Sequence, residues 1–179
     1  ANGFGWKPIL ADTVLQGFLG IESLRDTPGW ARKISFLIHA LNQHYEKLSY
    51  VMDWRDELVR SPLLQAEICN INNLAALQKA RKRLEEYPLV VILHSAAGDS
   101  MKLLLRILPW FQRRRGKVVM FIGNEYDLMD EKIRFIQQAG VEYVCSQLPE
   151  QAARWLYAEC RSSKILTMPH ALNPGLYHP

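Results

Sequence analysis

The chain has 179 residues, a net charge of +4 and 49% hydrophobic residues, which is typical of one soluble globular domain. No apolar run approaches the roughly 20 residues that cross a bilayer, and the N-terminus lacks the pattern of a signal peptide. The three cysteines are far apart and lack metal-type spacing, which favours a reduced, cytoplasmic protein without disulfides.

Residues 1–32 are expected to form an N-terminal helical appendage, because they do not fit the alternation that follows. From residue 33 onward, short apolar runs alternate with longer helical patterns. The strands are expected at 34–38, 66–71, 89–93, 118–122, 141–145 and 164–168. The helices are expected at 45–60, 73–87, 101–115, 130–139 and 149–160.

Several of the strand runs, notably 89–93 and 118–122, are apolar at every position. Strands of this kind are typically covered by helices on both faces and belong to parallel sheets. The repeated strand–helix–strand units therefore predict an α/β domain over 33–172, with a Rossmann-like, doubly wound parallel sheet of about six strands.

Four residues mark the expected helix ends. Gly116 and Gly140 are expected to stop the helices that precede them. Asp130 is expected to cap the helix over 130–139, and Pro149 is expected in the first turn of the last helix.

Candidate functional residues follow the strands, because ligands of open parallel sheets bind beyond the carboxyl ends of the strands. The polar residues and the glycine there are His39, Asn42, His94, Ser95, Gly98, Asp99, Ser100, Asn124, Glu125, Tyr126, Asp127, Gln147, His170 and Asn173. Such a set suits recognition of a ligand with many hydroxyl groups. Strand-to-helix loops are also generally polar and rich in helix caps, and Asp99 or Ser100 at the start of a helix fits that simpler interpretation.

Known catalytic motifs are absent for the most part. There is no P-loop, no dinucleotide-binding glycine motif after the first strand and no nucleophile elbow around Ser95. Glu125 and Asp127 are the only paired carboxylates of the kind that bind magnesium. No protein-bound metal is therefore expected.

Two basic clusters, 79–83 and 113–117, lie near the ends of expected helices. Solvated helix ends explain them most simply, since cations complement the helix dipole. The alternative is attraction to an anionic membrane surface or a phosphorylated acceptor. Nucleic acid is not an expected partner, because no base-stacking aromatic motif accompanies the charge.

Three segments carry a resemblance to a known family: KILTMPHALNPGLYHP at 164–179, VEYVCSQ at 141–147 and VMFIGNEYD at 119–127. They resemble the end of the N-terminal domain of GT-B glycosyltransferases, where a final strand runs into a proline-flanked linker. The set is most similar to the CgeB-like glycosyltransferases of bacterial surface polysaccharide and spore-coat pathways, within the broader glycosyl transferase group 1-like enzymes.

The resemblance implies the acceptor-side half of a two-domain enzyme. Residues 173–179 would begin the linker to a C-terminal domain that binds the nucleotide-sugar donor, and this domain alone would bind no cofactor and be inactive. The whole enzyme would transfer a sugar to a saccharide or other hydroxyl acceptor. Glu125, His94 and Asp99 would be the candidates to take the hydroxyl proton, and the other polar residues at the sheet edge would position the acceptor.

Two other functions stay open at this point. One is a non-catalytic, Rossmann-like module that binds a partner, with Trp110 and Phe111 beside the arginines as a contact surface. The other is a small hydrolase that would use Ser95, His170 and Asp127.

Overall fold

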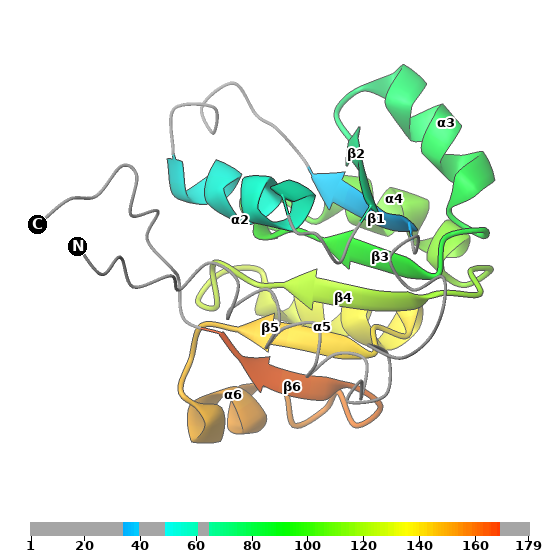
Figure 1. Ribbon diagram of the computed structural model, residues 1–179. Helices are drawn as coiled ribbons and strands as arrows, with labels where there is room; N and C mark the ends of the chain where they lie inside the picture. The colour runs from blue at the N-terminus through cyan, green and yellow to red at the C-terminus, as the bar shows by residue number, and fades with distance from the viewer. Residues whose placement is uncertain (1–33, 40–48, 61–64, 169–179) are drawn as a thin grey trace, which may run out of the picture.

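The computed structural model describes residues 34–39, 49–60 and 65–168 (Figure 1). The strands are β1 (Ile34–His39), β2 (Gln65–Asn70), β3 (Leu89–Ile92), β4 (Lys117–Phe121), β5 (Tyr143–Ser146) and β6 (Lys164–Thr167). The helices are α2 (Ser49–Arg60), α3 (Leu74–Arg83), α4 (Lys102–Phe111), α5 (Met129–Ala139) and α6 (Glu150–Leu156), and a short 3-10 turn, η3, covers His94–Ala96. None of the helices in these ranges is long and apolar enough to cross a membrane.

The strands form one sheet in the order β2-β1-β3-β4-β5-β6, and each neighbouring pair is parallel. The prediction of an α/β domain with a parallel sheet flanked by helices is confirmed. Because the strands are parallel, their carboxyl ends share one edge of the sheet, which we call the carboxyl edge. The chain runs outward from β1 to β2 and then returns past β1 to β3, so the winding direction reverses between β1 and β3.

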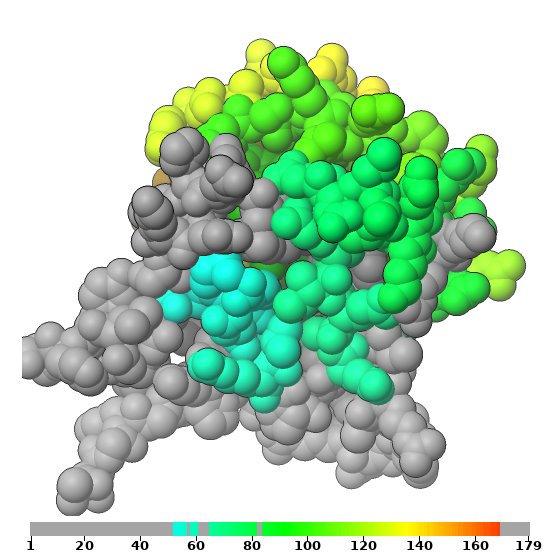
Figure 2. Space-filling view, turned by 90° about the horizontal axis from the view of Figure 1, so that it is seen from above, coloured from blue at the N-terminus to red at the C-terminus, as the bar shows by residue number. Residues whose placement is uncertain are grey.

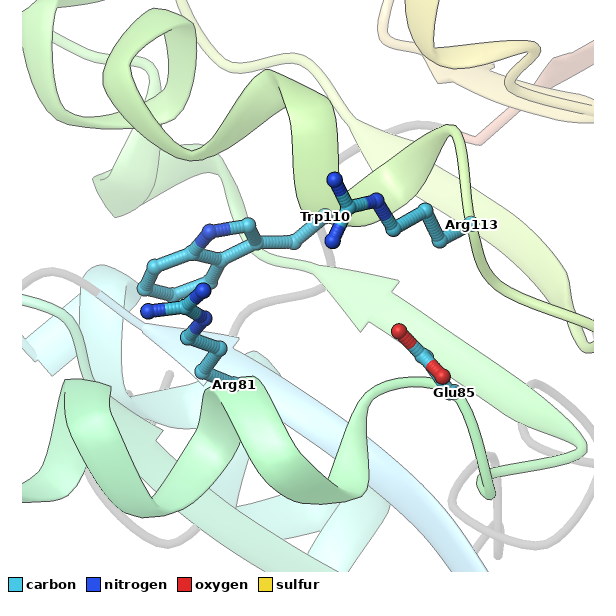
Figure 3. Close-up of a pocket in the computed structure, with 4 residues that line it drawn as sticks. All are labelled: Arg81, Glu85, Trp110 and Arg113. Atoms are coloured by element: carbon cyan, nitrogen blue, oxygen red, sulfur yellow. The ribbon is translucent and has the colours of Figure 1, made fainter.

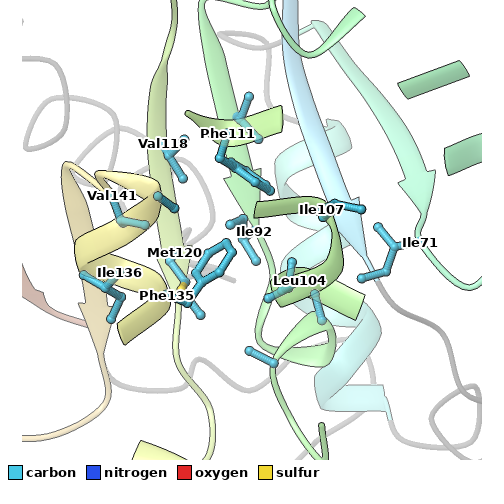
Figure 4. Packing of buried hydrophobic residues seen from close by; sticks show 14 of the residues in the cluster. Ile71, Ile92, Leu104, Ile107, Phe111, Val118, Met120, Phe135, Ile136 and Val141 are labelled. Carbon is cyan, nitrogen blue, oxygen red and sulfur yellow. The ribbon is translucent and has the colours of Figure 1, made fainter. Parts of the chain in front are cut away.

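The core lies on both faces of the sheet, as the apolar strand runs predicted. On one face, Val90 and Met120 belong to a cluster that includes residues of α3, α4 and α5. Phe111 of α4 and Phe135 of α5 meet edge to face in this cluster, with ring centroids 5.4 Å apart (Figure 4). Full burial of one such ring contributes on the order of 1.5–3 kcal/mol.

The opposite face carries the alternate residues of the same strands, such as Val119 and Phe121. Among the described helices, α2 covers this face, and the ring centroids of its Trp54 and of Phe121 are 4.9 Å apart. Figure 1 shows α2 in front of the sheet and α4 and α5 behind it. Viewed from the β2 side, α2 and α3 lie at the surface, with the α4 region beside α3 (Figure 2).

Of the two glycines predicted to end helices at the amino edge of the sheet, one does so and the other does not. Gly140 ends α5 in the left-handed conformation, with φ at 62°, as expected. The prediction for Gly116 is wrong, because α4 already ends at Phe111. Gly116 instead packs against the turn before β3, where an added Cβ would lie 1.9 Å from the carbonyl oxygen of Tyr87.

The predicted helix starts also need correction. Helix α5 begins at Met129 after Leu128, whose backbone is left-handed with φ at 53°. Asp130 therefore lies in the first turn and is not the cap. Pro149 immediately precedes α6, which is shorter than expected and ends at Leu156. Asn73 caps the start of α3, since its side-chain oxygen accepts a hydrogen bond from the amide of Ala76.

The arginine run 113–115 divides between surface and interior. Arg113 and Arg115 are exposed, as expected for a solvated helix end, but the side chain of Arg114 is only 8% exposed. Its guanidinium donates to the carbonyl oxygens of Phe111 and Ala139 and contacts both carboxylate oxygens of Glu142. Arg114 thus satisfies carbonyl groups at the ends of α4 and α5 together.

We expect Gly116→Ala to destabilise the protein by about 3 kcal/mol or more, since backbone atoms occupy the space of the new methyl group. Gly140→Ala is the matched control: the new methyl group would make only ordinary contact with the guanidinium of Arg114, 3.7 Å away, but the backbone is left-handed, so the change should cost about 1–2 kcal/mol. Urea unfolding of the two variants measures both values. Equal losses would contradict the close approach at Gly116.

Candidate functional site

The loops that follow β3 and β4 meet at the carboxyl edge. His94 and Ser95 form part of η3, directly after β3, and both are buried. Gly123 follows β4, and a Cβ at this position would lie 3.0 Å from the Cβ of His94. A side chain at Gly123 would therefore crowd the histidine, and the close approach brings two of the predicted loops together.

Glu125 lies at the centre of a network of hydrogen bonds between β4, β5 and α6. Its Oε1 accepts hydrogen bonds from the hydroxyls of Ser146 and Tyr157, the latter at 2.8 Å. Its Oε2 accepts one from the backbone amide of Gln147 at 3.1 Å. A carboxylate has about four acceptor positions, so three are occupied and one, on Oε2, is left for a ligand.

Tyr157 was not predicted as a site residue, and it is 2% exposed. Burial, followed by the charge and the hydrogen bond of Glu125, raises the pKa of its hydroxyl far above the usual value. The hydroxyl therefore stays protonated and acts as a permanent donor to Glu125. No pattern in the sequence indicated this role, because Tyr157 directly follows α6 and not a strand, and only residues that follow strands were considered as site candidates.

Lys132 is a second residue that the sequence prediction missed. It is fully buried, and its Nζ donates to the carbonyl oxygens of Asn124 and Asp127 in the loop after β4. Burial lowers the pKa of this ammonium group, against the opposing influence of Asp127, Glu125 and Asp99. One signal could have revealed it: Lys132 precedes Ile136 and Ala139 by four and seven residues, on the apolar stripe of α5.

Gln147, directly after β5, contributes the remaining hydrogen bonds of this network. Its side-chain amide donates to the carbonyl oxygens of Ile122 and Gly123, both at 3.3 Å, while its backbone amide holds Glu125. The structure therefore brings together His94, Asn124, Glu125 and Gln147, as the predicted edge requires.

The outer part of the site is open to solvent. Tyr126 is 86% exposed, and Asp99 and Asp127 are exposed as well. Gly98 is half-buried beside them. The hydroxyl of Ser100 accepts a hydrogen bond from the amide of Lys102, the first residue of α4, at 3.2 Å. This contact fits the simpler interpretation of Ser100 as a residue that caps a helix.

The remaining predicted residues lie elsewhere. His39 ends β1, opposite Asn70 of β2, and the pairing of Ile38 with Ile92 places it across the point of reversal from the loop of His94. Asn42, His170 and Asn173 lie outside the described residues. Within the described ranges, no group of three histidine, cysteine, aspartate or glutamate side chains is placed to hold a metal ion.

The arrangement supplies hydrogen-bond acceptors at an open edge, beside one exposed aromatic ring. Carboxylates of this kind can accept protons or hydrogen bonds from hydroxyl groups. No family model, no curated protein and no solved structure matches this chain.

The state of Tyr157 predicts an alkaline loss of stability. In the unfolded chain a tyrosine ionises near its ordinary pKa of 10.0, whereas folded Tyr157 keeps its proton, so the free energy of unfolding falls as pH rises above 10. Tyr157→Phe should cost about 1 kcal/mol at neutral pH, through the lost hydrogen bond, and should make that fall shallower. Urea unfolding between neutral pH and pH 11 tests both effects.

The exposed Tyr126 offers the matched control, and Tyr126→Phe should leave stability and its pH dependence unchanged. Burial also raises the thiol pKa of Cys69 and Cys160 to about 11. These two thiols therefore lower the free energy of unfolding at alkaline pH in every variant. Only the difference between variants therefore reports on Tyr157. Parallel curves for wild type and Tyr157→Phe would contradict the assignment.

Proposed function

We propose that this chain is the acceptor-side domain of a glycosyltransferase, with a Rossmann-like, doubly wound sheet of six strands as the N-terminal half of a GT-B architecture. The enzyme transfers a sugar from a nucleotide-sugar to a saccharide or other hydroxyl acceptor, in bacterial surface polysaccharide synthesis in the cytoplasm. The nucleotide-sugar binds to a second, C-terminal domain, and the acceptor binds at the carboxyl edge of this one.

The strand order supports this location for the acceptor. In open α/β sheets, ligands bind beyond the carboxyl ends of the strands, where the winding direction reverses. Here the reversal lies between β1 and β3, whose carboxyl ends carry His39 and His94. The loop after β4, with Glu125, adjoins His94 through Gly123.

The observation that carries the proposal is the setting of Tyr126. An aromatic ring that is 86% exposed lies in the chain between two carboxylates, Glu125 and Asp127. A single exposed ring is common on protein surfaces, so it is the position of Tyr126 beside two carboxylates at the carboxyl edge that singles it out. A sugar offers an apolar face of C–H groups to an aromatic ring and hydroxyl groups to neighbouring carboxylates, so this pair of features suits a saccharide acceptor.

In an inverting reaction, the acceptor oxygen attacks the anomeric carbon, the bond from that carbon to the nucleoside diphosphate breaks, and a protein group takes the hydroxyl proton. Glu125 is the first choice for that group, since its remaining acceptor position is held in place by three hydrogen bonds. His94 and Asp99 are the next choices. In a retaining reaction, all three position the acceptor.

The first experiment is the intact mass of the natural polypeptide from its source cells. A mass near twice the 20.7 kDa of this chain fits a second, donor-binding domain, and nucleotide-sugar turnover with saccharide acceptors is then assayed on the natural protein. A mass near 20.7 kDa, without turnover, would overturn the proposal in favour of a non-catalytic, Rossmann-like module that binds a partner.

In the active natural protein, Tyr126→Ala should raise KM for the acceptor about tenfold with little change in kcat, because the ring contributes binding and no chemistry. Tyr126→Phe should retain a normal KM. Trp155→Ala removes an aromatic residue that is similarly exposed, on α6, and should change neither constant.

Glu125→Gln should lower kcat by about 100-fold or more if the carboxylate is the base. Because the amide also disturbs the hydrogen bonds of Ser146 and Tyr157, Tyr157→Phe is the control for that disturbance. Undiminished turnover in Glu125→Gln would remove Glu125 as the base and leave His94 and Asp99.

A further inference from the structure

A pocket opens between α3 and α4, away from the carboxyl edge. Its volume is about 280 Å³, and it is lined by Arg81, Glu85, Trp110 and Arg113 (Figure 3). Both helices start after the carboxyl end of a strand, and these residues lie at or just beyond the opposite helix ends. The pocket therefore belongs to the amino edge of the sheet and is separate from the candidate functional site.

The side chains of the pocket are arranged around one aromatic ring. The guanidinium of Arg81 lies over the ring of Trp110, 5.8 Å from its centroid, at the distance of a cation–π contact. Figure 3 shows Arg113 and Glu85 on the other side of the pocket. Within the described part of the chain, neither Arg81 nor Arg113 forms an ion pair, whereas the adjacent Arg114 is paired with Glu142.

The pocket lies in the most positive part of the chain. Residues 74–117, which include α3 and α4, contain ten basic and three acidic residues. The other 135 residues contain twelve basic and fifteen acidic residues, so the positive charge of the chain is concentrated in this segment. The lining itself carries two arginines and one glutamate, and a net positive charge at a hollow raises the local concentration of anionic ligands.

We propose that this pocket binds a phosphate monoester on a hydroxyl-bearing carrier, with Arg81 and Arg113 holding the phosphate. Guanidinium groups form paired, charge-assisted hydrogen bonds with phosphate oxygens. Trp110 provides an apolar surface for the carrier, and Glu85 accepts a hydrogen bond from a carrier hydroxyl. Glu85 would repel a bare phosphate, which is why the ligand also carries a hydrogen-bond donor.

The same chemistry occurs in a soluble polyol phosphate and in a phospholipid headgroup, and binding to the two is measured separately. Binding of glycerol 1-phosphate is measured by calorimetry and by the part of the tryptophan fluorescence that is lost in Trp110→Phe, since the chain has five tryptophans. Binding to vesicles with phosphatidylinositol 4-phosphate, whose headgroup carries a phosphate monoester beside free hydroxyl groups, is compared with binding to neutral phosphatidylcholine vesicles. This inference does not rest on the proposed glycosyltransferase activity, because neither assay involves turnover.

The decisive comparison is within the arginine run. Arg113→Gln and Arg81→Gln should each weaken binding about tenfold or more, through loss of a charge-assisted hydrogen bond. Arg115→Gln removes the same charge from an exposed neighbour that does not line the pocket, and should change binding less than twofold. Thermal unfolding of each variant shows whether it is folded.

Glu85→Ala tests the carrier hydroxyl. It should strengthen binding of inorganic phosphate and reduce the preference for glycerol 1-phosphate over inorganic phosphate. Arginine-dependent binding to vesicles alone would support the pocket and identify a lipid headgroup as its ligand. Equal losses in Arg113→Gln and Arg115→Gln, or no binding of either probe, would overturn the proposal.

Discussion

Burial of the central strands on both faces is the constraint on which the rest of this structure depends. Val90 and Val91 are neighbours in β3, point to opposite faces and are both at most 2% exposed. Such strands need a cover on each side, and a parallel sheet with helical connections supplies it. Since both faces are then occupied, the edges of the sheet are the places where polar groups can gather and ligands can bind.

Each edge contains a charged side chain that joins several elements. At the carboxyl edge, Glu125 connects the loop after β4 to β5 and to Tyr157. At the amino edge, Arg114 connects the ends of α4 and α5 to Glu142 at the start of β5. A charge that is withdrawn from water needs compensating partners: half-buried Glu125 accepts three hydrogen bonds, and Arg114 donates to carbonyl oxygens and pairs with Glu142. The two edges are thus held by side chains, and the faces by apolar packing.

The sequence predicted what depends on local pattern and missed what depends on the third dimension. Continuous apolar runs such as 118–122 predicted parallel strands, and polar residues after them predicted the carboxyl edge. The burial of Arg114 could not be predicted, because a basic residue near a helix end is usually solvated, and for Lys132 the position on the apolar stripe of α5 was the one available signal. Gly116 was misassigned for a related reason, since the contact that requires a glycine comes from a turn almost thirty residues earlier.

The hydrogen bonds of Glu125 also constrain the order in which the protein can form. Its partners follow it by 21, 22 and 32 residues, in β5, in the next loop and after α6. During synthesis, which proceeds from the N-terminus, this carboxylate therefore leaves the ribosome well before any of its three donors. Water must solvate it until Tyr157 has emerged, so the carboxyl edge is completed only when nearly all of the described chain has been made.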